Sequence, residues 1–395
     1  MLDLSGSLDI ALRRNGDRIA PTIRSSRPVT AARVFAGKPV LEVARQLPML
    51  FSICATAQAQ ACAGACEQAL GLTPSPEVRR QRALLLRAET VKEHLWRLLL
   101  DWPQALDLPP AQVPMATAMR AYLALRHRYT KDADPFALGA DLPPIEAARA
   151  ADQARALAEV AMGSVFGMPP ACWLAQIGDR GALAAWARNA TTLAADLVRR
   201  VASADLAGLG RNAIDALPAS VVPDLAEALS SADADGFVAT PIWRCRAHET
   251  TPFARCLDRP LVADLAAEYG NGLLPRLAAL LMELADALVM LADAPEVAGR
   301  SDPASPEAAG VGSGVGWADA ARGLLVHRVE LVEARMTSYR ILAPTEWNFH
   351  PAGVVAAGLV GSALGRIEDD TELKRRAALY VPAVDPCVAY RLSVC

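Results

Sequence analysis

The last twelve residues of the sequence guide the interpretation of the whole chain: Val384-Asp385-Pro386-Cys387-Val388-Ala389-Tyr390-Arg391-Leu392-Ser393-Val394-Cys395. Asp-Pro-Cys at 385–387 predicts a rigid turn that presents a thiol, because proline fixes its own φ and biases the preceding residue away from the helical region. A thiol held in this way suits a metal or a redox partner. A lone cysteine is more often a small buried hydrophobic residue. Cys387 is therefore a candidate functional residue only if functional side chains from other parts of the chain lie close to it.

Size and composition favour a helix-rich protein with a large core. The 395-residue chain is 53% hydrophobic but only 5% aromatic, and Ala and Leu dominate it. Its 40 basic and 43 acidic residues give a net charge of -3, with no block of one sign. This pattern argues against nucleic acid or an anionic membrane surface as a partner. The longest apolar run, 273–292, is interrupted by Arg276, Glu283 and Asp286, so we expect an amphipathic core helix and no membrane insertion.

The cysteines predict a reducing compartment. Eight cysteines in a chain of this length and apolar content do not form the pattern of a disulfide scaffold. Residues 1–5 also lack the basic region that opens a secretory signal, and we therefore expect a cytoplasmic protein. No two cysteines form a C-x-x-C pair, which argues against a structural zinc knuckle and against a thioredoxin-type redox site.

The sequence patterns predict one strand pair and a series of helices. Alternating apolar and polar residues flank Asn15-Gly16, which is a β-hairpin signal. We expect one mainly α-helical (α+β) domain over 1–395, with a small N-terminal antiparallel β-sheet at 8–24, a helical body at 39–292, a flexible loop at 299–316 and a C-terminal part at 317–395 that returns to the site. Helical patterns cover 39–47, 52–70, 76–101, 112–129, 143–161, 178–203, 222–231, 260–292 and 318–337.

Three cysteines fall in one predicted helix. At about 100° per residue, Cys62 and Cys66 share a face, and Cys54 lies within a quarter turn of that face. A packing role for Cys62 and Cys66 in this Ala-rich helix is favoured over a metal role.

Five segments, taken in order, resemble the large subunit of nickel–iron hydrogenases. The hairpin at 6–26 looks like that family's N-terminal strand pair. Ser-Ile-Cys-Ala-Thr-Ala-Gln-Ala at 52–59 is similar to its R-x-C-G-x-C-P-T-A-H-A motif. Asp-Ala-Ala-Arg-Gly-Leu-Leu-Val-His at 319–327 is similar to E-A-P-R-G-x-x-x-H, and Tyr-Arg-Ile-Leu-Ala-Pro-Thr-Glu-Trp-Asn at 339–348 is similar to Y-Q-x-x-x-P-[ST]-T-W-N. Asp-Pro-Cys at 385–387 matches the start of D-P-C-x-x-C, so the resemblance covers both ends and the last quarter of the chain.

The departures from this family concern the metal ligands. The family holds nickel and iron with four thiolates, two from each C-x-x-C. Here Phe51 and Tyr390 stand at two of the four positions, and Cys54 and Cys387 remain at the other two. Nickel in such a site needs soft sulfur ligands, so we expect no nickel and no hydrogen turnover. The family's N-terminal glutamate also falls at about Ser5.

The resemblance implies that the surroundings of the iron's diatomic ligands survive. By position, Arg322 and Thr345 match the residues that donate hydrogen bonds to the two cyanides of the family's Fe(CN)2CO unit. Iron-bound cyanide keeps much of its negative charge, which suits a guanidinium group and a hydroxyl group in a dry pocket. The structural alternatives are a helix cap for Arg322 and a turn for Thr345. His327 and His350 are left out of the metal site, because a lone histidine is more often structural.

The complete pattern resembles hydrogenase expression/formation proteins of the HupK/HoxV type, which are paralogues of the large subunit. The resemblance implies a non-catalytic scaffold that carries the Fe(CN)2CO unit before transfer to the hydrogenase large subunit, with maturation proteins as further partners. Two alternatives stay open. One is a metal-free interaction protein that imitates the large subunit to engage maturation chaperones. The other is a divergent hydrogenase or other metal-dependent oxidoreductase that uses Cys62, Cys66 or Cys395 as replacement ligands. The helical segment at 93–102 could pack in the core or bind an assembly partner.

Overall fold

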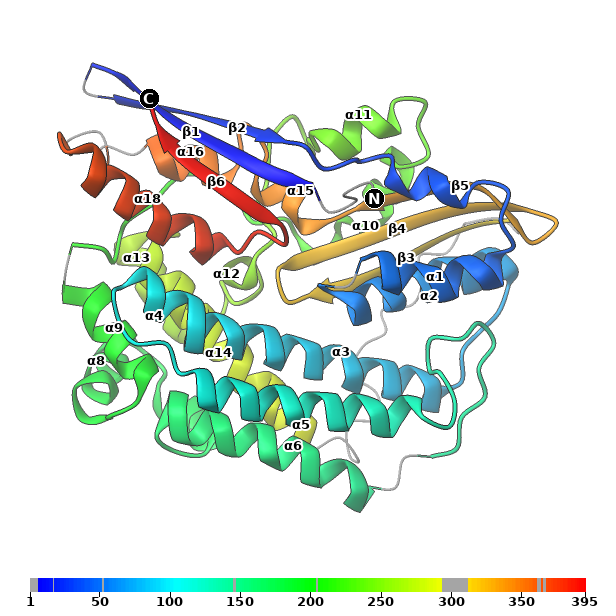
Figure 1. Cartoon of the computed structure of the whole chain (residues 1–395), viewed down its shortest axis with the longest axis horizontal. Coiled ribbons are helices and arrows are strands. Elements are labelled where there is room, and N and C mark those ends of the chain that lie inside the picture. Colours follow the sequence, from blue (N-terminus) through cyan, green and yellow to red (C-terminus); the bar gives the residue numbers. More distant parts are fainter. Residues whose placement is uncertain are drawn as a thin grey trace.

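Two three-stranded sheets lie beside a body of helices in the computed structural model of the chain (Figure 1). The structure describes residues 6–292 and 312–395, apart from residues 17, 52, 145, 146, 204, 361–363, 365 and 366. Helices make up most of this part. The prediction of a mainly α-helical α+β fold is therefore confirmed.

The first sheet joins the two ends of the chain. β1 (Ser7–Asn15) and β2 (Arg18–Ser25) form the predicted antiparallel hairpin, and Gly16 in its turn has a φ of 59°. β6 (Ala389–Val394) pairs with β1 in parallel, and Figure 1 shows the two strands side by side. The sheet is thus mixed, whereas the sequence predicted only an antiparallel pair. Because β6 directly follows the Asp-Pro-Cys turn, this pairing fixes Cys387 beside the N-terminal strands.

The second sheet corrects the helix predicted at 318–337. β3 (Ser313–Ala320), β4 (Gly323–Val332) and β5 (Arg335–Leu342) form an antiparallel sheet in the order β3-β4-β5. The predicted loop at 299–316 is also wrong where it overlaps β3, and its residues 299–311 lie outside the described residues.

The turns of the second sheet explain why the sequence pattern favoured a helix. Ala320 pairs with Gly323, so Ala321-Arg322 is a two-residue turn, and Gly323 has a φ of 136° that only glycine readily adopts. The next turn, Glu333-Ala334, has φ values of 50° and 57°, as in a type I′ turn. It lacks the Asn or Gly that usually marks such a turn. The start of β4 is buried without alternation, and such a run has no strand periodicity to detect.

The helical body follows the predicted segments closely. The predicted helices at 178–203 and 260–292 are each divided into two, and the helix predicted at 76–101 ends in a π-helical turn at Arg97–Asp101. The helices are α1 (Val40–Leu50), α2 (Ala55–Leu70), α3 (Pro76–Trp96), α4 (Trp102–Ala105), α5 (Gln112–Thr130), α6 (Ala147–Ala161), α7 (Pro170–Gln176), α8 (Arg180–Asn189), α9 (Leu193–Ser203), α10 (Val222–Ala228), α11 (Ala234–Ala239), α12 (Pro252–Arg255), α13 (Pro260–Tyr269), α14 (Leu273–Ala292), α15 (Pro344–Asn348), α16 (Val354–Val360) and α18 (Asp370–Val384).

The apolar helix α14 lies inside this body and is buried along most of its length. It contacts α3, α6, α7 and α13. Its charged side chains have partners, because Arg276 pairs with Glu249 and Glu283 pairs with Arg255. These pairs allow a charged helix to stay in the core. Over the described ranges, no helix combines the length and the apolar character needed to cross a membrane.

The close contact between β3 and α2 depends on Gly316. A Cβ atom at this position would lie 2.1 Å from the Ala61 carbonyl oxygen and 2.3 Å from the Ala65 backbone nitrogen. We predict that Gly316→Ala lowers the free energy of unfolding by about 1–3 kcal/mol, because the strand must move away from the helix. Denaturant unfolding measures the change.

Gly163→Ala is the matched control, since a Cβ atom there meets nothing within 4 Å. The control should change the free energy of unfolding by less than about 1 kcal/mol. Equal effects of the two substitutions would contradict the packing of β3 on α2.

Candidate functional site

The four residues predicted to form the site come from four separate segments. Cys54 immediately precedes α2, and Arg322 lies in the β3–β4 turn. Thr345 is the second residue of α15, and Cys387 lies between α18 and β6. The Cys387 sulfur is 2.8 Å from the Thr345 hydroxyl oxygen. Arg322 lies close enough to Cys387 and Cys54 to interact electrostatically with both residues. The fold thus brings the four side chains together, and their roles as ligands and donors stay predictions.

Arg322 is the centre of a buried ionic network. Its Nη2 donates to Glu93 Oε2 at 2.8 Å, and its Nε donates to Asp385 Oδ1 at 3.1 Å. Burial alone would lower the pKa of Arg322, but Asp385 and Glu93 together raise it. Its Nη1 is buried and has no hydrogen-bond partner within the described part of the chain. Arg322 is therefore not the helix cap considered above, and one of its donor groups is available to a ligand.

Cys54 lies at the N-terminus of α2, where the first amide groups are occupied by a carboxylate. Glu89 accepts hydrogen bonds from the backbone nitrogens of Thr56 at 2.8 Å and Ala57 at 3.0 Å. Gln58 Nε2 lies 3.8 Å from the Cys54 sulfur. Burial, followed by the fields of Cys387 and Glu89, raises the pKa of Cys54 to about 12. Cys54 is therefore expected to keep its proton at neutral pH.

Arg27 is a site residue that the sequence analysis missed. It follows β2, and its Nη1 donates to the Cys387 sulfur at 2.7 Å. Its Nε pairs with Glu346 Oε1 at 2.8 Å. Glu346 stands where the Y-Q-x-x-x-P-[ST]-T-W-N motif has threonine. This replacement of threonine by glutamate was the one signal in the sequence for a basic partner near Thr345.

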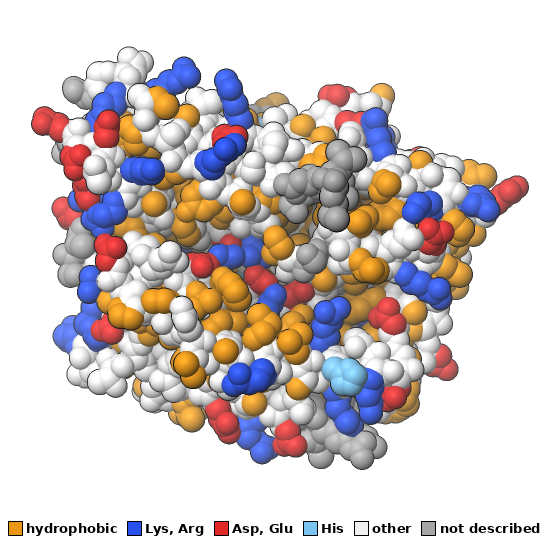
Figure 2. Space-filling model, in the orientation of Figure 1, with side chains coloured by type: hydrophobic (Ala, Val, Ile, Leu, Met, Phe, Trp, Pro, Cys, Tyr) orange, Lys and Arg blue, Asp and Glu red, His pale blue; other side chains and the backbone are white. Residues whose placement is uncertain are grey.

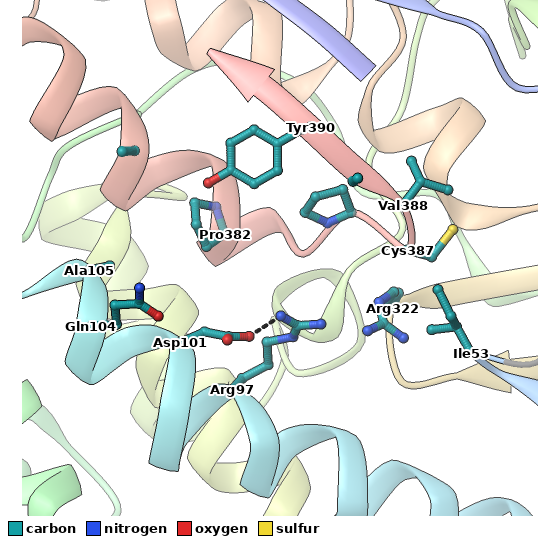
Figure 3. A pocket seen from close by; sticks show the side chains of 13 residues that line it. Ile53, Arg97, Asp101, Gln104, Ala105, Arg322, Pro382, Cys387, Val388 and Tyr390 are labelled. Atoms are coloured by element: carbon teal, nitrogen blue, oxygen red, sulfur yellow. Dashed lines mark hydrogen bonds and ion pairs between the residues drawn. The ribbon is translucent and has the colours of Figure 1, made fainter. Parts of the chain in front are cut away.

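A pocket of about 580 Å³ opens beside Cys387 and Arg322. Figure 3 shows Arg322 between Arg97 and Ile53, with Tyr390 of β6 on the opposite side of the pocket from Ile53. Arg97 pairs with Asp101 and also with Asp385, the latter with 2.9 Å from Arg97 Nε to Asp385 Oδ1. Figure 2 shows blue and red side chains in a hollow in the middle of this face, between hydrophobic side chains. The site is thus charged and open to solvent on one side.

The two replaced ligand positions do not supply sulfur. Phe51 packs partly buried beside α1, and Tyr390 lines the pocket, where burial raises its pKa. Ser5 lies outside the described residues. Over the described ranges, no group of three or more His, Cys, Asp or Glu side chains could hold a metal ion. The donor set therefore serves a bare metal ion poorly. Two thiols, the unpartnered Nη1 of Arg322 and the hydroxyl of Thr345 do fit an iron that brings its own diatomic ligands.

Cys62 and Cys66 lie in a different part of the core from Cys387. The sulfurs of Cys62 and Cys66 are 4.0 Å apart, and both residues are buried among Phe35, Tyr339 and residues of the second sheet. His327 belongs to the same region, with its Nδ1 2.9 Å from the Tyr339 hydroxyl oxygen. His350 is elsewhere and accepts from the Ala352 backbone nitrogen at 2.9 Å. Cys395 is exposed at the end of β6.

The segment at 93–102 faces the core with most of its side chains. His94, Leu98, Leu99 and Trp102 are buried, whereas Trp96 is 39% exposed. His94 Nε2 lies 2.6 Å from the Glu283 carboxylate of α14. This segment therefore packs in the body and supplies Glu93 to the ionic network.

The raised pKa of Cys54 predicts slow and strongly pH-dependent alkylation. Only the thiolate reacts, so the rate at Cys54 should rise about tenfold per pH unit between about pH 7 and pH 10. A free cysteine peptide, with a thiol pKa of about 8.5, should level off within that range. Iodoacetamide labelling of the metal-free protein, followed by peptide mass spectrometry, measures the rate at each cysteine. A Cys54 rate that levels off together with the free peptide would contradict the prediction.

The chain is similar to known proteins along nearly its whole length. The family model described as nickel-dependent hydrogenase matches residues 276–391, a range that contains Arg322, Thr345 and Cys387. The hydrogenase expression/formation protein HoxV of Cupriavidus necator is 32% identical over 94% of this chain and 92% of its own length. The corresponding HupK of Azotobacter vinelandii is 28% identical, over 99% of both chains.

A solved structure shows the same fold. The reduced, active nickel–iron–selenium hydrogenase of Desulfomicrobium baculatum superposes with a TM-score of 0.62 at 15% identity, over 95% of each chain. Identity this low establishes the fold alone, while the near full-length match to HoxV establishes kinship. The chain therefore belongs to the hydrogenase expression/formation proteins of the HoxV/HupK type, a family with the fold of the hydrogenase large subunit.

Proposed function

We propose that the chain is a maturation scaffold, which holds the Fe(CN)2CO unit and passes it to the hydrogenase large subunit. One arrangement carries the proposal: Cys387 and Arg322, whose buried Nη1 has no partner in the described part of the chain, line one pocket. The Thr345 hydroxyl group contacts the Cys387 sulfur, and Cys54 lies close enough to Cys387 and Arg322 to interact electrostatically with both. The names of its relatives support a role in hydrogenase formation. The proposal includes the cytoplasm as the compartment, and maturation proteins together with the large subunit as partners.

Each residue has a distinct task in this proposal. Cys54 and Cys387 hold the iron, which arrives as cargo with its two cyanides and one carbon monoxide. Arg322 Nη1 and the Thr345 hydroxyl group donate to the cyanide nitrogens, because charge-assisted hydrogen bonds favour acceptors that keep negative charge. Two sulfur ligands in place of four hold the cargo firmly enough to protect it and weakly enough to release it. Nickel would need more soft ligands, so the proposed role is non-catalytic.

A second candidate is a metal-free interaction protein that imitates the large subunit. Its support is the apolar surface at the end of α1 and beside the pocket. Met49 is 79% exposed and Ile53 is 43% exposed, and Ile53 also lines the pocket. A partner could cover these side chains. Such a protein would need this surface but not the two sulfurs, which makes the two candidates separable by experiment.

Infrared spectroscopy tests the proposed cargo. We expect the protein, purified without oxygen from a host that expresses the maturation machinery, to show metal–cyanide and metal–carbonyl bands and to contain iron without nickel. Cys54→Ser and Cys387→Ser should each abolish the bands, since one sulfur ligand would remain. Cys172→Ser removes an exposed cysteine of α7 and is the matched control.

A conservative change at Arg322 refines the same experiment. Arg322→Lys keeps the positive charge near Glu93 and Asp385 but removes the planar fork. We expect its affinity for the iron unit to fall about 10–100-fold, as is typical for groups that support a metal ligand. A metal-free wild-type protein without such bands would favour the interaction protein. Unchanged bands in both cysteine variants would contradict the assigned ligands.

A further inference from the structure

Arg27 places a permanent positive charge beside the sulfur of Cys387, one of the two proposed iron ligands. Its Nη1 lies 2.7 Å from Cys387 Sγ, and its Nε lies 2.8 Å from Glu346 Oε1. The side chains of Arg27 and Glu346 are only 15% and 8% exposed. A guanidinium group cannot lose its proton in a protein, so this charge is present at every physiological pH.

A second guanidinium group, that of Arg322, stands near the same sulfurs. Its carboxylate partners are Glu93 and Asp385, as the partner of Arg27 is Glu346. Each carboxylate is therefore engaged by an arginine and is not a spare ligand for a metal. A cation that approaches the Cys387 sulfur meets Arg27 at hydrogen-bond distance from that sulfur.

This arrangement distinguishes two kinds of metal cargo by their charge. A bare divalent ion on Cys387 would bring two positive charges within a few ångströms of the Arg27 guanidinium group. Solvent screens this repulsion only in part, because the Arg27 side chain is 15% exposed. Ferrous iron with two cyanides has no net charge, because the cyanides cancel the charge of the metal. Repulsion from Arg27 therefore acts on the bare ion and spares the preassembled unit.

We infer that Arg27 is a specificity-determining residue, which excludes bare divalent metal ions from the Cys54–Cys387 pair and admits the charge-neutral iron unit. This inference rests on the proposed function, since it names the selectivity of the same site. The competing explanation is structural: the Arg27–Glu346 pair would only tie the hairpin to α15. If that explanation holds, loss of the Arg27–Glu346 pair changes the stability of the fold but not the affinity for metal ions.

Cobalt binding to the metal-free protein tests the inference. Equilibrium dialysis against Co²⁺ without oxygen should show that Arg27→Gln binds the ion at least about tenfold more tightly than the wild type, because the repelling charge is gone. Arg27→Lys keeps the charge and should stay near the wild type. Arg24→Gln removes an exposed arginine of the same hairpin and should leave the affinity unchanged. The gain in Arg27→Gln should vanish when Cys387→Ser is added.

Two outcomes would overturn the inference. One is equal cobalt affinity in Arg27→Gln and in the wild type, including the case in which neither binds. The other is a gain that survives Cys387→Ser. If Arg27→Gln alone does not fold, as judged by circular dichroism, the double variant with Glu346→Gln removes both charges and leaves no unpaired carboxylate. That double variant must then show the same gain.

Failure of this inference is distinguishable from failure of the proposed function. The cobalt experiment uses metal-free protein and does not depend on the maturation machinery. Infrared bands in the wild type together with equal cobalt affinities would keep the scaffold and remove the role of Arg27. Absence of the infrared bands from the wild type would contradict the scaffold proposal, whatever the cobalt result.

Discussion

The ion pairs of Arg322 are the interaction on which the site depends. They join α3 through Glu93 and the C-terminal segment through Asp385 to the β3–β4 turn. Removing one partner of a buried ion pair typically costs about 3–5 kcal/mol, because the remaining charge is left uncompensated. Asp385 has a φ of 59°, which few residues other than glycine adopt, and two arginines hold it there. The position of Cys387, two residues later, follows from this network.

The same network links structure to the proposed chemistry. Two of the three donor nitrogens of Arg322 are used to fix neighbouring segments, and this leaves Nη1 free of a protein partner in the described part of the chain. A donor that is immobilised before a ligand arrives loses little conformational freedom when it binds. Cys387 is held in a similar way, by Thr345 and Arg27. Binding of the iron unit would have to displace the proton of Cys54 and loosen the contact between Arg27 and Cys387, and both costs favour later release.

The sequence allowed the proposed site to be predicted because each of its four residues lies in a short segment with recognisable spacing. Cys54 precedes an alanine-rich helix, and Arg322, Thr345 and Cys387 follow motifs of the large-subunit family. Long-range pairing could not be predicted in the same way. Strand β6 pairs with β1 across almost the whole chain, and only the fold sets this register. The second sheet was missed because its Glu333-Ala334 turn lacks the residues that normally mark such turns. Arg27 reaches Cys387 across 360 positions, and no local pattern records that contact.

Transfer of a labelled iron unit tests the scaffold account most directly. The protein would be loaded with isotope-labelled cyanide on its iron, mixed without oxygen with metal-free hydrogenase large subunit, and separated again by an affinity tag. We expect the shifted cyanide bands to leave this protein and to appear on the large subunit, because the two-sulfur site holds its cargo less firmly than a four-sulfur site. Labelled bands that stay on this protein, or a large subunit that acquires no label, would contradict it.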